Sequence, residues 1–220
     1  MKEKYKLLGN LSDQLKRVLG LIADLISLNL LFLLSCLLVV TAGAGFTSCY
    51  TFTFRLIRGD TQSLPFGSFF KDFIKCFKKS TLAWLLLLLA LGIFAGDAYF
   101  AYYVCVPVSK FFLIFAAVMG VFVLGTGIWL FPLIARYENK LGTHIKNAFL
   151  MMLANLPKTL LSLVVWVVCI AFPVVMPNIF AYVGWMWIAF SFSLPMYVTA
   201  LLFRKQLACE IPADEEKKED

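Results

Sequence analysis

The chain alternates between long apolar stretches and short basic segments. Residues 25–54 contain no Asp, Glu, Lys or Arg, and further stretches cover residues 80–109, 111–135 and 159–203, with Asp97 as their only charge. A helix needs about 20 apolar residues to cross a bilayer core of roughly 30 Å. Each stretch meets that length, so the pattern predicts an all-α polytopic membrane protein.

Two of these stretches are too long for one crossing. The stretch 159–203 would form a helix of about 67 Å at 1.5 Å per residue, so it must fold back on itself. Its turn signals are Pro173, Pro177 and Asn178. In the stretch 25–54 we expect the reversal at "TAGAG" (41–45), because glycine adopts the positive φ of a tight turn without steric cost.

The basic residues set the expected orientation. Segments 1–24, 55–79, 136–158 and 204–220 hold five, six, four and four of the 20 Lys and Arg residues. Lys and Arg favour cytoplasmic segments, which predicts that all four segments and both termini are cytoplasmic in a multi-pass protein of the cell membrane. Six crossings paired as three hairpins then follow, at about 20–40, 44–58, 80–104, 111–135, 159–176 and 180–203. We expect one membrane domain, 1–209, and an acidic cytoplasmic tail, 210–220.

Two alternatives concern the first hairpin. Its second arm is only about 21 Å long by helical rise and could be re-entrant. We prefer a full crossing, because re-entry from outside would place the basic segment 55–79 on the wrong side. "AGA" (42–44) resembles a signal-peptide cleavage site, but about 24 residues would precede the apolar region, which is long for such a peptide.

The segment "PFGSFFKDFIKCFKKS" (65–80) has the clearest helical pattern. One apolar face with helical spacing opposes a face rich in lysine. That apolar face contains Phe66, Phe69, Phe70, Phe73, Ile74 and Phe77. The pattern fits an interfacial helix on anionic lipid. It also fits a helix that docks a cytoplasmic partner through Phe69, Phe70, Phe73 and Phe77. Segment 136–159 resembles it weakly, which places amphipathic inner-surface helices before the third and fifth spans.

Few polar residues lie at membrane depth. Asp24 and Asn29 fall in the first span, and an intramembrane carboxylate or amide is a candidate functional group. We expect Asp24 to pair with Arg17 or Arg136. Hydroxyl groups in the second arm should bond across helices or to their own backbone. These belong to Thr47, Ser48, Thr51 and Thr53.

Composition narrows the class of protein. The chain is 61% hydrophobic and 15% charged, and its net charge of +7 follows the span ends rather than forming a nucleic-acid surface. His144 is the only histidine, and the six cysteines show no CxxC spacing. No catalytic motif, metal-ligand pattern or phosphate loop occurs, so we expect neither an enzyme nor a cofactor.

Several stretches resemble one family of bacterial membrane proteins. They are "ADLISLNLLFLL", "VVTAGAG", "RLIRGD", "FFKDFIKCFKKSTLAW", "FPLIARYENKLGTHIKNAFLMMLANLPKTLL" and "FSLPMYVTALLFR". In order and spacing they resemble the YesL-type family, a domain of unknown function found mainly in Gram-positive bacteria. The family-type positions that we select as candidate structural or coupling residues are Asp24, Asn29, Arg58, Arg136, Glu138, Asn139, Asn147 and Asn155.

The resemblance implies a gene neighbourhood of carbohydrate ABC importers and glycoside hydrolases. We therefore expect a non-enzymatic accessory or interaction subunit in carbohydrate uptake. Its expected partners are the lipid bilayer and ABC permease subunits, with no nucleic acid. The alternative is a small solute transporter with Asp24, Asn29 and Arg136 near its inner mouth.

Overall fold

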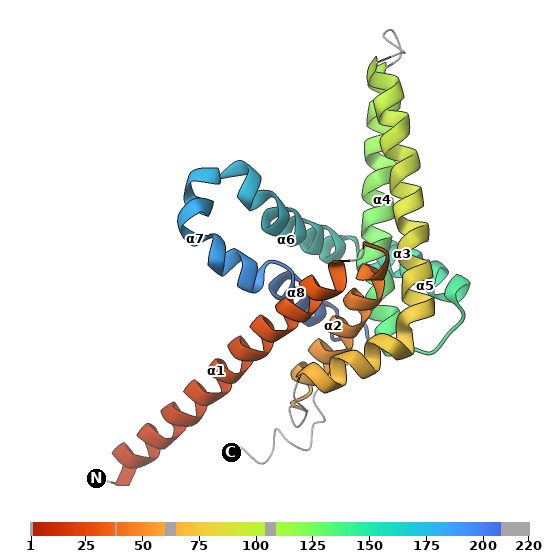
Figure 1. Ribbon diagram of the computed structural model, residues 1–220. Coiled ribbons are helices and arrows are strands. Elements are labelled where there is room, and N and C mark those ends of the chain that lie inside the picture. The colour runs from red at the N-terminus through yellow and green to blue at the C-terminus, as the bar shows by residue number, and fades with distance from the viewer. Residues whose placement is uncertain (1, 38, 60–64, 104–108, 208–220) are drawn as a thin grey trace.

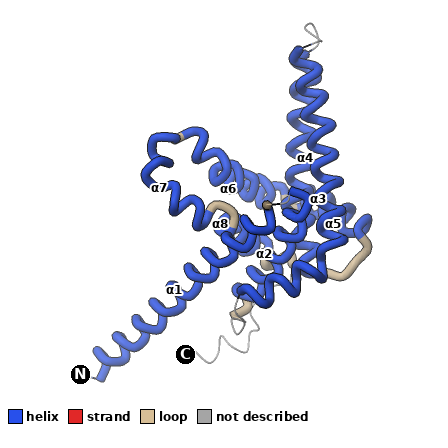
Figure 2. Tube along the Cα trace, viewed as in Figure 1, coloured by secondary structure: helices blue, strands red, loops and turns tan. Residues whose placement is uncertain are grey.

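The computed structural model describes residues 2–37, 39–59, 65–103 and 109–207, and these residues form helices without any strand (Figure 1, Figure 2). The helices are α1 (Lys2–Cys36), the 3₁₀ helix η1 (Val39–Thr41), α2 (Ala42–Ile57), α3 (Pro65–Tyr103), α4 (Ser109–Arg136), α5 (Leu141–Ala154), α6 (Leu156–Val175), α7 (Pro177–Phe190) and α8 (Ser193–Phe203). The predicted all-α class is confirmed.

Within the described ranges, four helices are long and apolar enough to cross a membrane. They are Gln14–Cys36, Phe66–Tyr103, Lys110–Arg136 and Leu156–Val175. Parts of α7 and α8, which meet at a 44° bend, can form a fifth span as a pair. A multi-pass protein is thus supported, while the predicted count of six is not confirmed. α2 has 16 residues and is about 24 Å long, shorter than a bilayer core.

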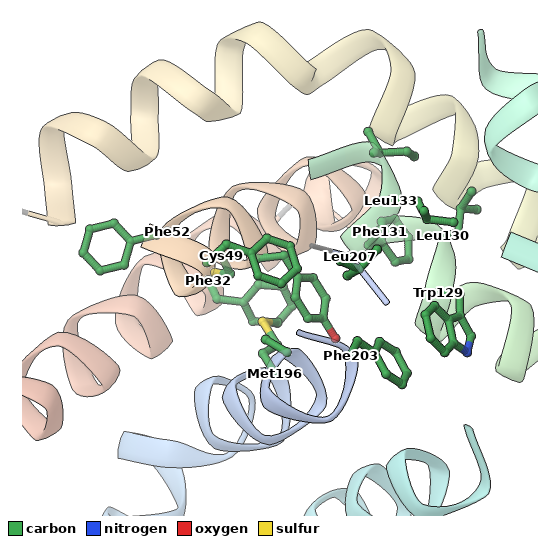
Figure 3. Close-up of a cluster of buried hydrophobic side chains, with 14 of the residues drawn as sticks. Phe32, Cys49, Phe52, Trp129, Leu130, Phe131, Leu133, Met196, Phe203 and Leu207 are labelled. Atoms are coloured by element: carbon green, nitrogen blue, oxygen red, sulfur yellow. The ribbon is translucent and has the colours of Figure 1, made fainter. Parts of the chain in front are cut away.

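α2 occupies the centre of the molecule. It contacts α1, α3, α4 and α8, and twelve of its sixteen residues are buried. Side chains of α1, α2, α4 and α8 form one apolar cluster around it (Figure 3). Trp129 of α4 stacks on Phe203 of α8, with ring centroids 3.6 Å apart. A short helix with no free face therefore organises the longer ones.

Two hairpins extend from this centre. α3 pairs with α4, and α6 pairs with α7, while the N-terminal half of α1 extends to the opposite side (Figure 1). α3 is one continuous helix whose first part crosses beside α2 before the chain turns into the hairpin (Figure 1). The amphipathic segment and the third span are therefore parts of the same helix rather than two separate ones.

The hairpins expose apolar side chains along their length. Examples are Leu89 of α3, Val121 of α4 and Val168 of α6. Exposed tyrosines, including Tyr99 and Tyr103, lie at the far end of α3. Tyrosine is enriched where membrane spans reach the bilayer surface. This surface is suited to contact with a lipid bilayer.

The predicted reversal at residues 41–45 is wrong in position and in cause. α2 begins at Ala42, directly after the 3₁₀ helix Val39–Thr41, so Gly43 and Gly45 lie inside α2. Among the described glycines only Gly59, which follows α2, has a positive φ, of 77°. A Cβ atom on Gly43 would collide with the Ser80 carbonyl oxygen and the Trp84 side chain, and one on Gly45 with Ser35. These glycines permit close helix packing instead.

Hydroxyl groups reinforce that packing. Thr47 lies one turn after Gly43, and its hydroxyl is 2.7 Å from the Ser80 hydroxyl of α3. The hydroxyls of Thr47, Ser48, Thr51 and Thr53 also donate to carbonyl groups four residues earlier. The expectation that they bond across helices or to their own backbone is confirmed.

Replacing Gly43 with Ala should destabilise the protein. The added methyl group must displace the backbone of α3 at Ser80, and overpacking of this kind costs about 1–3 kcal/mol. The measurement is thermal unfolding in detergent. Gly92→Ala is the control, because a Cβ atom on Gly92 would meet no neighbouring atom. Since Ala favours a helix over Gly by up to about 1 kcal/mol, this variant should be no less stable than the wild type. Equal stability of the two variants would contradict this account of the α2–α3 contact.

Candidate functional site

Two basic segments come together at one surface. Lys75 Nζ of α3 lies 2.6 Å from Glu138 Oε1, and Lys79 Nζ donates to the Asn139 carbonyl oxygen at 3.2 Å. The Lys75 and Glu138 side chains are 68% and 76% exposed. An exposed pair contributes little to stability, so its value here is to show that the two segments lie close together. Its hydrogen bond lowers the pKa of Glu138. We call the surface formed by residues 66–80 and 137–154 the basic face.

A partly buried ion pair holds the first part of α3 against α2. Arg55 Nη2 donates to Asp72 Oδ1 at 3.0 Å and lies 2.8 Å from Oδ2. Neither residue was among the candidates predicted from the sequence. The available signal was a single acidic residue in a lysine-rich helix that follows a helix ending in arginine. Because Asp72 is buried while Arg55 is only half-buried, loss of Arg55 would leave the Asp72 carboxylate uncompensated.

The phenylalanine stripe divides between two environments. Phe69 is 1% exposed, and Phe73 packs against the same apolar cluster, with the two ring centroids 6.0 Å apart. Phe70 is 46% exposed, and Phe77 is also exposed. Phe69 and Phe73 are therefore packed against the protein's own core. Of the predicted docking residues, only Phe70 and Phe77 are accessible to a partner.

A groove of about 440 Å³ lies between the end of α4 and α5. Its polar lining residues are Tyr137, Asn139, His144 and Asn147. Its apolar lining residues are Leu133, Leu150, Met151 and Ala154. Two predicted candidates, Asn139 and Asn147, are thus brought together beside His144 and Tyr137, which sequence analysis did not select.

His144 ties the start of α5 to the preceding connection. Its Nε2 accepts a hydrogen bond from the Asn139 backbone N–H, with 3.3 Å between the nitrogens. Only the neutral imidazole can accept at this atom. Burial lowers the pKa of His144 from its ordinary value, and the Lys79 cation lowers it further. The lowered pKa keeps the His144 imidazole neutral, and in that form it holds the backbone at Asn139.

Asn29 bridges the break between α7 and α8. Its Nδ2 donates to the Ile188 carbonyl oxygen at 2.5 Å, while its Oδ1 accepts from the N–H groups of Phe192 and Ser193 at 2.9 and 3.0 Å. In an unbroken helix Phe192 N–H would bond to Ile188 directly. The Asn29 amide therefore replaces a backbone hydrogen bond between two helix segments.

Asn155 has a related position between α5 and α6. Its backbone, with φ of −128°, ends α5, and its Nδ2 donates to the Met151 carbonyl oxygen at 3.1 Å. Its Oδ1 accepts from Gln206 at 3.3 Å. The amide adds a second hydrogen bond to the Met151 carbonyl oxygen, which already accepts from the Asn155 backbone N–H, and it links this helix end to Gln206.

Of the remaining candidates, Glu138 belongs to the basic face, whereas Asp24, Arg58 and Arg136 lie outside its residue ranges. Asp24 lies half-buried on α1 and has no ion pair within the described ranges, so the predicted pairs with Arg17 and Arg136 are wrong. Arg58 follows α2, and Arg136 ends α4, both half-buried. Glu138 pairs with Lys75 of α3. The eight candidates are thus distributed over several places and do not form one site.

Replacing Asn29 with Ala should destabilise the α7–α8 junction. Each buried backbone group left without a partner costs about 1–3 kcal/mol. Unfolding in detergent should therefore require less heat for Asn29→Ala than for Asn178→Ala, which changes an exposed asparagine. If both variants unfold at the wild-type temperature, Asn29 does not hold the junction.

Acidification should weaken the protein through His144. The fold lowers the pKa of this group, so its stabilising effect is present above about pH 6.5 and is lost as the pH falls through the lowered value. The melting temperature should fall between pH 7 and pH 5 in the wild type and less in His144→Gln. No second histidine in the sequence complicates the comparison. Parallel pH profiles for the two proteins would contradict this role.

Comparison with known proteins gives a family match for part of the chain. A family described as "Protein of unknown function, DUF624" matches residues 25–98, which run from α1 through most of α3. This region holds the Gly43–Ser80 contact, the Arg55–Asp72 pair and the phenylalanine stripe. No curated protein and no solved structure matches the chain. Residues 25–98 are thus similar to a family of unknown function.

Proposed function

We propose that the protein is a non-enzymatic accessory or interaction subunit associated with ABC-type carbohydrate uptake. The observation that supports an interaction role is the basic face, where Phe70 and Phe77 stay exposed beside lysines. The link to carbohydrate rests on the resemblance to the YesL-type family. In this proposal the basic face and both termini are cytoplasmic, as the distribution of Lys and Arg favours.

The basic face is well ordered for binding. Phe69 anchors the first part of α3 in the core, and Arg55 holds it through Asp72. Lys75 and Lys79 connect it to the segment that follows α4. A surface that is already ordered loses less conformational entropy when a partner binds. The exposed phenylalanines supply the desolvated contacts that dominate interface energies, and the lysines favour an acidic partner surface.

A small solute transporter is the second candidate. The α7–α8 break supports it, since transporter sites often use discontinuous helices. The hydroxyls of Ser191 and Ser193 at this break are buried and have no hydrogen-bond partner among the described residues. Sugar movement by the purified protein alone in liposomes would support this second candidate.

Truncation of both exposed phenylalanines should weaken binding to the permease. A dominant aromatic contact is worth about 2 kcal/mol or more, so Phe70→Ala with Phe77→Ala should reduce affinity by about 30-fold. The measurement is the amount of carbohydrate ABC permease that co-purifies from membranes in mild detergent, together with growth on the imported sugar. Phe100→Ala is the control, because it removes an exposed ring from the far end of the same helix.

The outcomes separate the two candidates. Loss of the permease with the double change, and not with Phe100→Ala, supports the accessory role. If all variants recover equal amounts of permease, the exposed phenylalanines of the basic face are not the docking surface. If no permease accompanies even the wild type, and the protein alone moves sugar, the transporter replaces the accessory subunit.

A further inference from the structure

The groove between α4 and α5 has a polar end and an apolar end. α5 runs back along α4, because His144 lies beside Asn139 while Met152 lies beside Thr126, with 3.7 Å between Sδ and Oγ1. Residue 126 is ten residues before the end of α4, which corresponds to about 15 Å. On α4 the groove itself extends from the end of the helix back to Leu133, about one turn into the candidate span.

The polar end offers unused hydrogen-bond donors. The side-chain amides of Asn139 and Asn147 have no hydrogen bond to the described residues, and Asn147 is half-buried. Lys79 brings a cation to this end through its contact with the Asn139 carbonyl oxygen, which uses one of its three donors. Glu138 is the nearby acid, and Lys75 offsets its charge. The balance favours an anion.

The apolar end is formed by Leu133, Leu150, Met151 and Ala154. Leu150 and Ala154 are exposed on a helix that leads directly into the candidate span 156–175. Exposure of these apolar side chains to water is unfavourable, and a hydrocarbon chain that covers them would remove this cost. A ligand that fits both ends must itself be amphipathic, with a negative head and an apolar chain.

We propose that this groove holds one anionic phospholipid. Its phosphate lies at Lys79, Asn139 and Asn147, and one acyl chain follows Leu133, Leu150 and Ala154. The head is then at the membrane surface and the chain points into the bilayer, as in the surrounding leaflet. Lys140 and Lys146, exposed and adjacent in the chain to the two asparagines, add to the attraction for the negative head. This site is separate from the exposed phenylalanines of α3.

The test uses the full chain, purified in a neutral detergent and stripped of lipid. Phosphatidylglycerol, phosphatidylcholine or glycerol 3-phosphate is added, and bound molecules are counted by native mass spectrometry alongside thermal unfolding. One phosphatidylglycerol should be retained per chain and should raise the unfolding temperature. Phosphatidylcholine should bind more weakly, and glycerol 3-phosphate should have no effect, because it lacks the acyl chain.

Matched variants locate the site. Ala154→Trp fills the groove and should abolish retention, whereas Ala117→Trp, on an exposed part of α4, should not. Lys79→Gln should weaken phosphatidylglycerol binding about fivefold, while Lys78→Gln, its exposed neighbour, should have less effect. Should Ala154→Trp fail to fold, Leu150→Asn removes apolar wall without adding volume and should also reduce retention.

Three results would overturn the proposal. Equal retention by Ala154→Trp and Ala117→Trp would show that lipid binds outside the groove. Equal weakening by Lys79→Gln and Lys78→Gln would show a diffuse attraction to basic residues. Stabilisation by glycerol 3-phosphate equal to that by phosphatidylglycerol would show a site for a soluble anion. None of these outcomes depends on whether a permease binds to α3.

Discussion

The close approach of α2 and α3 determines where the other helices lie. At one end of their contact Gly43 has no side chain, and the Ser80 backbone and Trp84 occupy the space. At the other end Arg55 binds Asp72. Between these points α2 contacts both the amphipathic part of α3 and the start of its long apolar part. One short helix thus holds two differently solvated halves of α3 against a single core.

Asparagine side chains perform a second task that the membrane makes necessary. Backbone groups without partners are costly in a region that lacks water. Asn29 satisfies such groups at the α7–α8 break, whereas Asn155 links the α5–α6 break to the Gln206 side chain. The α6–α7 hairpin lies between these two breaks. Its connections to the core therefore rely on side-chain amides as well as on apolar packing.

The basic face combines two surfaces with different chemistry. The exposed side of α3 presents phenylalanine beside lysine, which suits a protein partner. The α4–α5 groove changes from amide and hydroxyl groups to leucine and alanine, which suits a lipid. Contacts of Lys75 and Lys79 join the two surfaces. A lipid in the groove would therefore support the same segment that positions the exposed phenylalanines.

Hydropathy and charge along the chain determined the class of protein, the apolar stretches and the amphipathic helix at residues 65–80. These are local properties, and they survive in any arrangement of the helices. Only the tertiary structure decided how the phenylalanine stripe divides, because burial of Phe69 and exposure of Phe70 depend on where α2 lies. The same holds for Asn29, whose partners are about 160 residues away along the chain. Sequence identified Gly43 and Gly45 as special but assigned them to a turn, since glycine serves both sharp turns and close packing and only the neighbouring helix distinguishes the two.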